Sequence, residues 1–246
     1  MAFKDYFSGH ASAYAESRPD YPVDLFAFLA GLCASHDHAW DCATGNGQAA
    51  RALAAQFARV TATDASADQI ANAPVIDGVV FEAASAEASG LGDASVDCVT
   101  VAQAAHWFDT GRFHAEVERV VRPGGVVARW CYGHCAIEPE IDQVVREFYA
   151  GPVNDHWPPE RRHIESGYAD LDFPFERVPT PAFAMRKRWD RRRYLAYIAT
   201  WSAVKRYVAE TGEDPIERLD RDLDRLWPAE EEREIVWPLA LQVGRR

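Results

Sequence analysis

The sequence has no long hydrophobic run and no excess of basic residues, and each absence excludes a class of protein. No apolar stretch approaches the roughly 18 residues that a membrane-spanning helix needs, and no N-terminal segment resembles a signal peptide. Acidic residues outnumber basic ones, 38 to 26, and the net charge is -12. Binding to a nucleic-acid backbone depends on clustered Lys and Arg. We therefore expect a cytoplasmic protein with no membrane and no nucleic-acid partner.

Cysteine spacing excludes a further class, the zinc-bound or disulfide-stapled domain. The five cysteines stand at positions 33, 42, 98, 131 and 135, with neither a zinc-ligand nor a disulfide pattern. Cys131 and Cys135, with His134 between them, form the one local cluster, and its spacing does not suit a metal. We expect reduced thiols and no bound metal.

The most informative segment that is present reads AWDCATGNGQ, residues 39–48. It has the form of a buried strand that runs into a turn and then a helix. Gly45 and Gly47 lack a Cβ atom, which lets the backbone approach a ligand closely. Asp64 ends the next expected strand, about 20 residues beyond the turn, where nucleotide-binding α/β folds hold a ribose. These features predict a nucleoside-type cofactor.

Alternation of strands and helices over residues 38–131 predicts a doubly wound sheet. Residues 96–102 are continuously apolar, as in a parallel strand that is covered on both faces. We expect strands at 38–43, 59–64, 79–83, 96–102 and 126–131, and helices at 22–36, 47–58, 66–73 and 110–121. The third of these helices should begin at Ser66, a good N-cap.

The chain changes character after residue 132, where charged, helical segments are divided by prolines. Residues 171–178 and 235–243 are strand-like, and Pro174 and Pro238 suit only edge or bulged positions. We expect an α/β fold with a Rossmann-like, mostly parallel seven-stranded sheet and a helical insertion before the last strand. Its expected parts are an N-terminal arm and helix (1–37), the cofactor-binding core (38–132), a helical substrate cap (133–233) and a closing strand (234–246).

Several further motifs give the chain a family likeness. They read SAE at 85–87, AQAAHWFD at 102–109 and RVVRPGG at 119–125, beside DCATGNG at 41–47 and Asp64. With these motifs the chain resembles the class I S-adenosylmethionine-dependent methyltransferases, in particular the small-molecule, type 11 branch that includes trans-aconitate methyltransferase-like proteins. The resemblance extends to residues 18–22 and 197–207, and so spans nearly the whole chain.

The resemblance implies S-adenosylmethionine as cofactor, S-adenosylhomocysteine as product, and a role for several residues. Asp41 should orient the methionine amino group, Asp64 should accept both ribose hydroxyls, and residues 85–87 should frame the adenine. Ala43 stands where the family more often has glycine, and we expect a negative φ there. The cofactor-binding residues so implied are Tyr14, Arg18, Asp41, Ala43, Thr44, Gly45, Gly47, Asp64, Ala65, Ser85, Ala86, Glu87, Ala102 and Gln103. Tyr14 and Arg18 belong to an arm that should close over the cofactor as a lid.

Methyl transfer from a sulfonium is an in-line displacement, so the protein must mainly align the acceptor and exclude water. His106 is the candidate base or site-lining residue; the open alternative is a buried structural histidine beside Trp107. Trp107 and Trp201 should line the acceptor site, and Lys205 or Arg206 should bind an acceptor carboxylate. For those two cations the alternative is a solvated helix face.

The basic runs at 186–188 and 191–193 should pair with acids such as those at 213–224 and 230–234; the open alternative is that they neutralise an acidic ligand. The sequence contains no Asn/Asp-Pro-Pro-Tyr motif and no Pro-Cys dipeptide, which disfavours a DNA base as acceptor. The leading hypothesis is methyl transfer to a small molecule, a carboxylate or a hydroxyl, by a monomer or homodimer. Two alternatives stay open: a catalytically silent cofactor-binding scaffold and a nicotinamide-dependent oxidoreductase.

Overall fold

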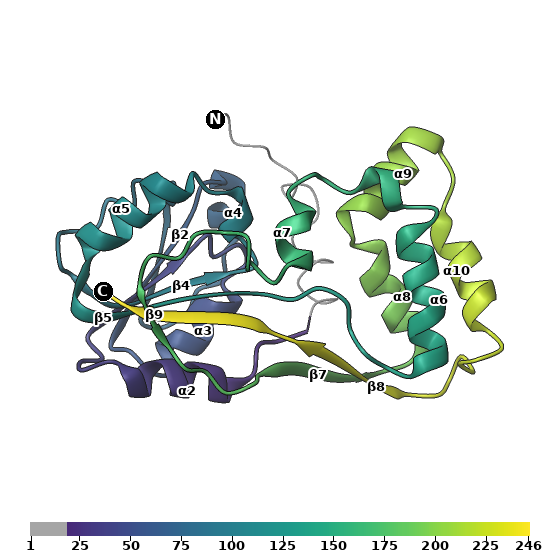
Figure 1. Cartoon of the computed structure of the whole chain (residues 1–246), viewed down its shortest axis with the longest axis horizontal. Helices are drawn as coiled ribbons and strands as arrows, with labels where there is room; N and C mark the ends of the chain where they lie inside the picture. Colours follow the sequence, from purple (N-terminus) through teal and green to yellow (C-terminus); the bar gives the residue numbers. More distant parts are fainter. Residues whose placement is uncertain (1–18) are drawn as a thin grey trace.

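The computed structural model describes residues 19–246, and a seven-stranded sheet forms its centre (Figure 1). The strand order is β3-β2-β1-β4-β5-β9-β6, with parallel pairing from β3 through β5 and antiparallel pairing of β9 with both its neighbours. The strands are β1 (His38–Cys42), β2 (Arg59–Asp64), β3 (Val79–Ala83), β4 (Val96–Ala102), β5 (Val121–Cys131), β6 (Glu176–Val178) and β9 (Ala240–Arg245). The predicted mostly parallel, seven-stranded fold is confirmed.

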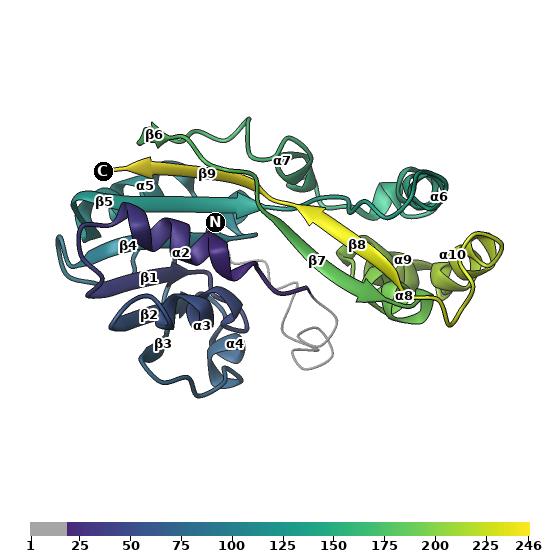
Figure 2. The same cartoon turned by 90° about the horizontal axis from the view of Figure 1, so that it is seen from below.

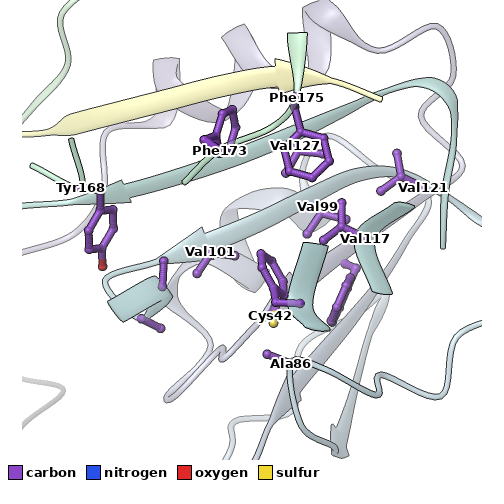
Figure 3. Packing of buried hydrophobic residues seen from close by; sticks show 14 of the residues in the cluster. Cys42, Ala86, Val99, Val101, Val117, Val121, Val127, Tyr168, Phe173 and Phe175 are labelled. Atoms are coloured by element: carbon purple, nitrogen blue, oxygen red, sulfur yellow. The ribbon is translucent and has the colours of Figure 1, made fainter. Parts of the chain in front are cut away.

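Helices cover both faces of this sheet. On one face α2 (Val23–Leu32) and α3 (Gln48–Ala54) pack against small residues of β1, β2 and β5, and Figure 2 shows α2 lying across the strands. On the other face α5 (Thr110–Val120) packs its apolar side into the cluster drawn in Figure 3. The short helix α4 (Ala67–Ala71) begins as predicted, because the Ser66 side chain accepts a hydrogen bond from the Gln69 amide.

A second group of elements lies beyond the carboxyl ends of β4 and β5 (Figure 2). We call it the helical lobe, and its members are α6 (Pro139–Ala150), α8 (Arg191–Ala199), α9 (Ser202–Thr211), α10 (Pro215–Leu223), the 3-10 turn η2 (Asn154–His156) and the ribbon of β7 (Ala184–Trp189) and β8 (Arg233–Pro238). Helix α7 (Arg161–Glu165) lies between the sheet and the lobe (Figure 1). Within the described chain no helix is long and apolar enough to span a membrane.

The last predicted strand, residues 235–243, is wrong as a single element. The chain changes partner near Pro238: β8 pairs with β7 in the ribbon, whereas β9 pairs with β5 and β6 in the main sheet. Proline lacks the N–H that a continuing ladder needs, so the division falls there. The predicted part boundaries differ in the same way, because β8 belongs to the ribbon and β6, within 133–233, belongs to the main sheet. Strand β7 was not predicted.

Several predicted ends are also displaced. Helix α2 stops at Leu32 rather than 36, and α3 spans Gln48–Ala54 rather than 47–58. Strand β5 begins at Val121, five residues earlier than expected, because Val121 already pairs with Val96 across a register shift. The expected edge strand is confirmed, since β6 lies at the sheet edge beyond Pro174.

The pairing of the basic runs with acids is confirmed. Arg186 contacts Glu234 at 3.2 Å and Arg188 contacts Glu232 at 3.8 Å, both across the β7–β8 ribbon. Arg191, which is buried, contacts Asp220 at 2.9 Å and Asp224 at 2.7 Å. Of these arginines, Arg191 is the buried one, and it joins α8 to α10.

Candidate active site

A tight turn follows β1 at the carboxyl edge of the sheet. Gly45 (φ +55°) and Gly47 (φ +79°) both adopt left-handed backbone conformations. A Cβ at Gly45 would meet no atom within 4 Å, whereas at Gly47 it would lie 2.8 Å from the Phe81 ring. The backbone at Gly45 therefore borders open space, as a surface that a ligand approaches closely must do.

Ala43 has φ +56°, so the expected negative φ is wrong. The Thr44 amide donates to the Thr63 carbonyl at 2.9 Å, which draws the chain toward β2 just after β1 ends. A left-handed residue with a Cβ costs about 1 kcal/mol. The turn is thus held in a strained conformation by its hydrogen bonds to the neighbouring strand.

Asp41 lies at the end of β1 with its side chain buried, at 1% relative exposure. Its carboxylate accepts hydrogen bonds from the hydroxyls of Thr44 at 2.6 Å and Thr100 at 2.8 Å. Burial raises the pKa of Asp41 to about 6, although both hydroxyl bonds favour the charged form. The site thus holds a carboxylate that binds or loses its proton close to neutral pH.

Asp64, at the end of β2, reaches back to the same turn. One oxygen accepts the Gly45 amide at 2.9 Å and the other accepts the Ser66 amide at 2.9 Å. Each carboxylate oxygen has a second lone pair, so both can still accept from ligand hydroxyls. Two carboxylates on adjacent strands therefore flank one glycine-containing turn, while Ala65 beside them is exposed.

The segment after β3 closes the same edge. Ser85 and Ala88 form an isolated bridge, and Ala86 between them is buried. The Glu87 carboxylate accepts the Asp109 amide at 3.0 Å, which ties this segment to the start of α5. Glu87 itself lies in a turn and not in a helix.

Gln103 (φ +58°) follows Ala102 at the end of β4. Its side-chain amide donates to the Tyr132 carbonyl at 3.0 Å and accepts the Tyr132 amide at 2.8 Å. The side chain therefore joins the ends of β4 and β5.

His106 lies in the short turn η1 (Ala105–Trp107) that follows β4. Its Nδ1 atom is 2.9 Å from the hydroxyl of Tyr168, and its ring lies 4.6 Å from that of Trp107. Burial, followed by the charges of Arg161 and His163, lowers the pKa of His106 to about 3. Tyr168 is fully buried. It belongs to the apolar cluster drawn in Figure 3 and lies at the end of that cluster opposite Val121. His106 is therefore neutral at pH 7 and held by a residue 62 positions away.

Three of the residues expected at the acceptor site, Trp201, Lys205 and Arg206, lie in the helical lobe. Trp201 packs against Tyr149 and Trp157, with ring centroids 6.0 and 5.7 Å apart. Lys205 is exposed, and Arg206 donates to the His156 carbonyl at 3.4 Å. Tyr14 and Arg18 lie outside the described residues.

Three comparisons relate this chain to known proteins. The family described as "Methyltransferase domain" matches residues 40–129, which include the turn and both carboxylates. A protein of Dictyostelium discoideum that carries the name methyltransferase is 32% identical over 225 residues, covering 90% of this chain and 86% of the relative. A solved structure from Anaeromyxobacter dehalogenans that carries the name type II methyltransferase is 42% identical, with a TM-score of 0.88 over 93% of this chain and 97% of that one.

The chain belongs to the class I S-adenosylmethionine-dependent methyltransferases. This assignment replaces the nicotinamide-dependent oxidoreductase alternative. A Mycobacterium tuberculosis protein named an uncharacterized methyltransferase is 35% identical over 120 residues, and that match spans about half of each chain.

The sequence reading missed three residues of this methyltransferase's candidate site: Thr100, Tyr168 and Arg161. Thr100 stands inside an apolar strand, where nothing in the sequence marks its hydroxyl as a partner of Asp41. Tyr168 and Arg161 lie in the region between β5 and β7, where the sequence shows no motif of the family. The partners of Thr100 and Tyr168 lie 59 and 62 positions away in the sequence, and contacts over such separations leave no local pattern.

Proposed function

We propose that this methyltransferase transfers a methyl group from S-adenosylmethionine to a small-molecule acceptor bound beside His106. The cofactor, when bound, supplies an electrophilic methyl group on a sulfonium. Asp41 would hold the methionine amino group and Asp64 the ribose hydroxyls. Residues 43–47 would pass beneath the cofactor, and residues 85–87 would border its adenine. The net charge of -12 favours a small acceptor over a nucleic acid.

The observation that carries this proposal is the pair Asp41 and Asp64 on either side of one glycine turn. The turn borders open space at Gly45, and the Asp64 oxygens keep unused acceptor capacity. The ammonium group and the ribose hydroxyls of S-adenosylmethionine are hydrogen-bond donors. Asp41 and Asp64, at the carboxyl ends of adjacent parallel strands, are carboxylates that would accept from them.

His106 supports this function as a site-lining group. A pKa of about 3 leaves its imidazole neutral and weakly basic at pH 7. A carboxylate acceptor needs no base, because it is already ionised, and alignment with exclusion of water can provide most of the acceleration. The chain's task would be to position the acceptor rather than to move a proton.

Isothermal titration with S-adenosylmethionine, S-adenosylhomocysteine and NADH tests the proposal. We expect micromolar binding of the first two and none of NADH. Asp64→Ala should weaken both by at least 100-fold without unfolding the protein, whereas Asp68→Ala, an exposed acid on α4, should bind normally. Unchanged affinity in Asp64→Ala would contradict the proposal. Tight binding with no methyl loss across a broad acceptor panel would instead favour the silent scaffold.

A further inference from the structure

Arg161 begins α7, the helix that lies between the sheet and the helical lobe (Figure 1). Its guanidinium carbon lies 4.6 Å from the centre of the Trp157 ring and 5.5 Å from that of Tyr149. Its Nε atom donates to the Tyr149 hydroxyl at 3.0 Å. Two aromatic rings and one hydrogen bond thus hold the guanidinium in a defined orientation.

The charge of Arg161 is not neutralised by any carboxylate within 4 Å among residues 19–246. The acid of the same helix, Glu165, accepts a hydrogen bond from the Tyr149 hydroxyl instead. Arg119 and Arg191 have two carboxylate partners each. The buried Arg129 has no acid partner among residues 19–246 either, but its guanidinium donates to the Gln242 side chain and to the Leu171 carbonyl. The two Nη atoms of Arg161, which can donate to both oxygens of a carboxylate, have no hydrogen-bond partner among residues 19–246.

A second donor lies beside this guanidinium. The Trp157 Nε1 atom is buried and has no hydrogen-bond partner among the described residues. A buried N–H without an acceptor is unfavourable, so such atoms are rare in folded proteins. The Arg161 guanidinium lies over the Trp157 ring, so its unused N–H groups and the unused indole N–H are close to each other.

Helix α7 packs against η1, which follows β4, and the Cys131 thiol at the end of β5 lies 3.9 Å from the Ile164 carbonyl of α7. After burial, the charge of Arg161 is the next cause that lowers the pKa of His106, which follows β4, and the pKa of His134, which follows β5. The same charge opposes the effect of burial on the Cys131 thiol at the end of β5. Arg161 therefore acts on the groups that border the proposed methyl-transfer site.

We propose that Arg161, together with the Nε1 atom of Trp157, binds an anionic group of the methyl acceptor, so that the acceptor is an organic acid. A carboxylate and a phosphate share the chemistry that this site recognises, and each would accept from the guanidinium fork and the indole. The inference rests on the proposed function and replaces Lys205 and Arg206 as the acceptor's cationic partner.

Calorimetric titration of benzoate, citrate and inorganic phosphate into the full-length protein, with and without saturating S-adenosylhomocysteine, tests this inference. Benzamide, which has the shape of benzoate but no charge, is the neutral control. We expect at least one anion to bind, benzamide not to bind, and Arg161→Gln to weaken the anion at least 10-fold. Arg161→Lys should recover part of the affinity. Arg162→Gln, on the next and exposed residue, is the matched control and should bind like the wild type.

Cofactor affinity separates this inference from the proposed function. S-Adenosylhomocysteine should bind Arg161→Gln as tightly as it binds the wild type, which also shows that the variant is folded. Equal anion binding by the wild type and Arg161→Gln, or none by the wild type, overturns the inference and leaves the proposed function standing. Failure of the wild type to bind S-adenosylhomocysteine overturns the proposed function itself. Preferential binding of benzoate or citrate identifies a carboxylate acceptor, and preferential binding of phosphate identifies a phosphorylated one.

Discussion

The sheet and the helical lobe are packed from different residues. The face of the sheet under α2 and α3 includes the alanines Ala39, Ala62 and Ala128, whose small side chains let helices approach closely. The lobe is packed with large rings, among them Trp189, Tyr194, Tyr197, Trp227 and Trp237, with centroids 5.3 to 6.3 Å apart. Regular backbone pairing therefore organises the sheet, whereas specific contacts between rings organise the lobe.

Buried charged side chains also have different partners in the two regions. Asp41 in the sheet is held by two hydroxyls and, among the described residues, by no cation within salt-bridge distance. Arg191 in the lobe is held by two carboxylates and by the Trp227 carbonyl. Removing one partner of a buried ion pair destabilises the fold, whereas a buried carboxylate without a cation already costs stability. This contrast separates the ion-paired arginine of the lobe from the unpaired carboxylate of the sheet.

Among the variants that test this difference between the regions, Asp41→Asn should have the largest effect on cofactor affinity and on stability. We expect S-adenosylhomocysteine affinity to fall at least 100-fold, because the amide cannot attract the ammonium group. The folded-state pKa of Asp41 is about 6, above its ordinary 3.8, so ionisation disfavours folding increasingly as pH rises between those values. The variant should therefore gain up to about 3 kcal/mol over the wild type at pH 8, and little of this at pH 4.

Urea unfolding at both pH values, combined with calorimetric titration, checks this prediction. Wild-type affinity for the cofactor should also decline as pH falls through about 6, as Asp41 becomes protonated. Asp68→Asn is the control, since its carboxylate is exposed. A variant that is less stable than the wild type at pH 8 would show that Asp41 is structural.

Arg191→Ala should act on the lobe alone, with an intermediate effect. Removing the guanidinium takes away the partner of Asp220 and Asp224 and leaves the Trp227 carbonyl without its donor, at a cost of about 2 kcal/mol. Hydrogen exchange should quicken in α8 and α10 but not in β1 or β4. Arg192→Ala, on the exposed neighbour, should leave exchange unchanged. Equal loss of protection in the sheet would mean that the two regions unfold as one unit.

Tyr168→Phe should have the smallest effect, at the point where the two regions meet. The loss of its hydrogen bond to His106 should cost about 1 kcal/mol. The pKa of His106 should stay well below 6.5, because burial is its main cause. NMR titration of the imidazole measures this directly, with Tyr207→Phe as the control. A return of the pKa to its ordinary value would assign the shift to Tyr168 instead.

Local patterns predicted β2, β3 and β4 to the residue, and the end of α5 to within one. These elements depend on short-range alternation of apolar strands and amphipathic helices, which the sequence displays directly. The ribbon β7–β8 was missed for the opposite reason: β7 is a highly charged segment whose partner lies about 50 residues away. Its charges were correctly paired with acids, yet their strand conformation was not predicted.

For the candidate site, local sequence patterns predicted the glycine turn, Asp41 and Asp64, because these residues lie at the ends of strands whose order along the chain brings those ends together. Tertiary structure alone decided the left-handed Ala43, the hydroxyl of Thr100 on Asp41, Tyr168 on His106 and Arg161 on its aromatic rings. The reason is physical. A strand-end motif is set by neighbours in sequence, whereas a buried contact across 60 residues depends on how the region between β5 and β7 packs against the sheet.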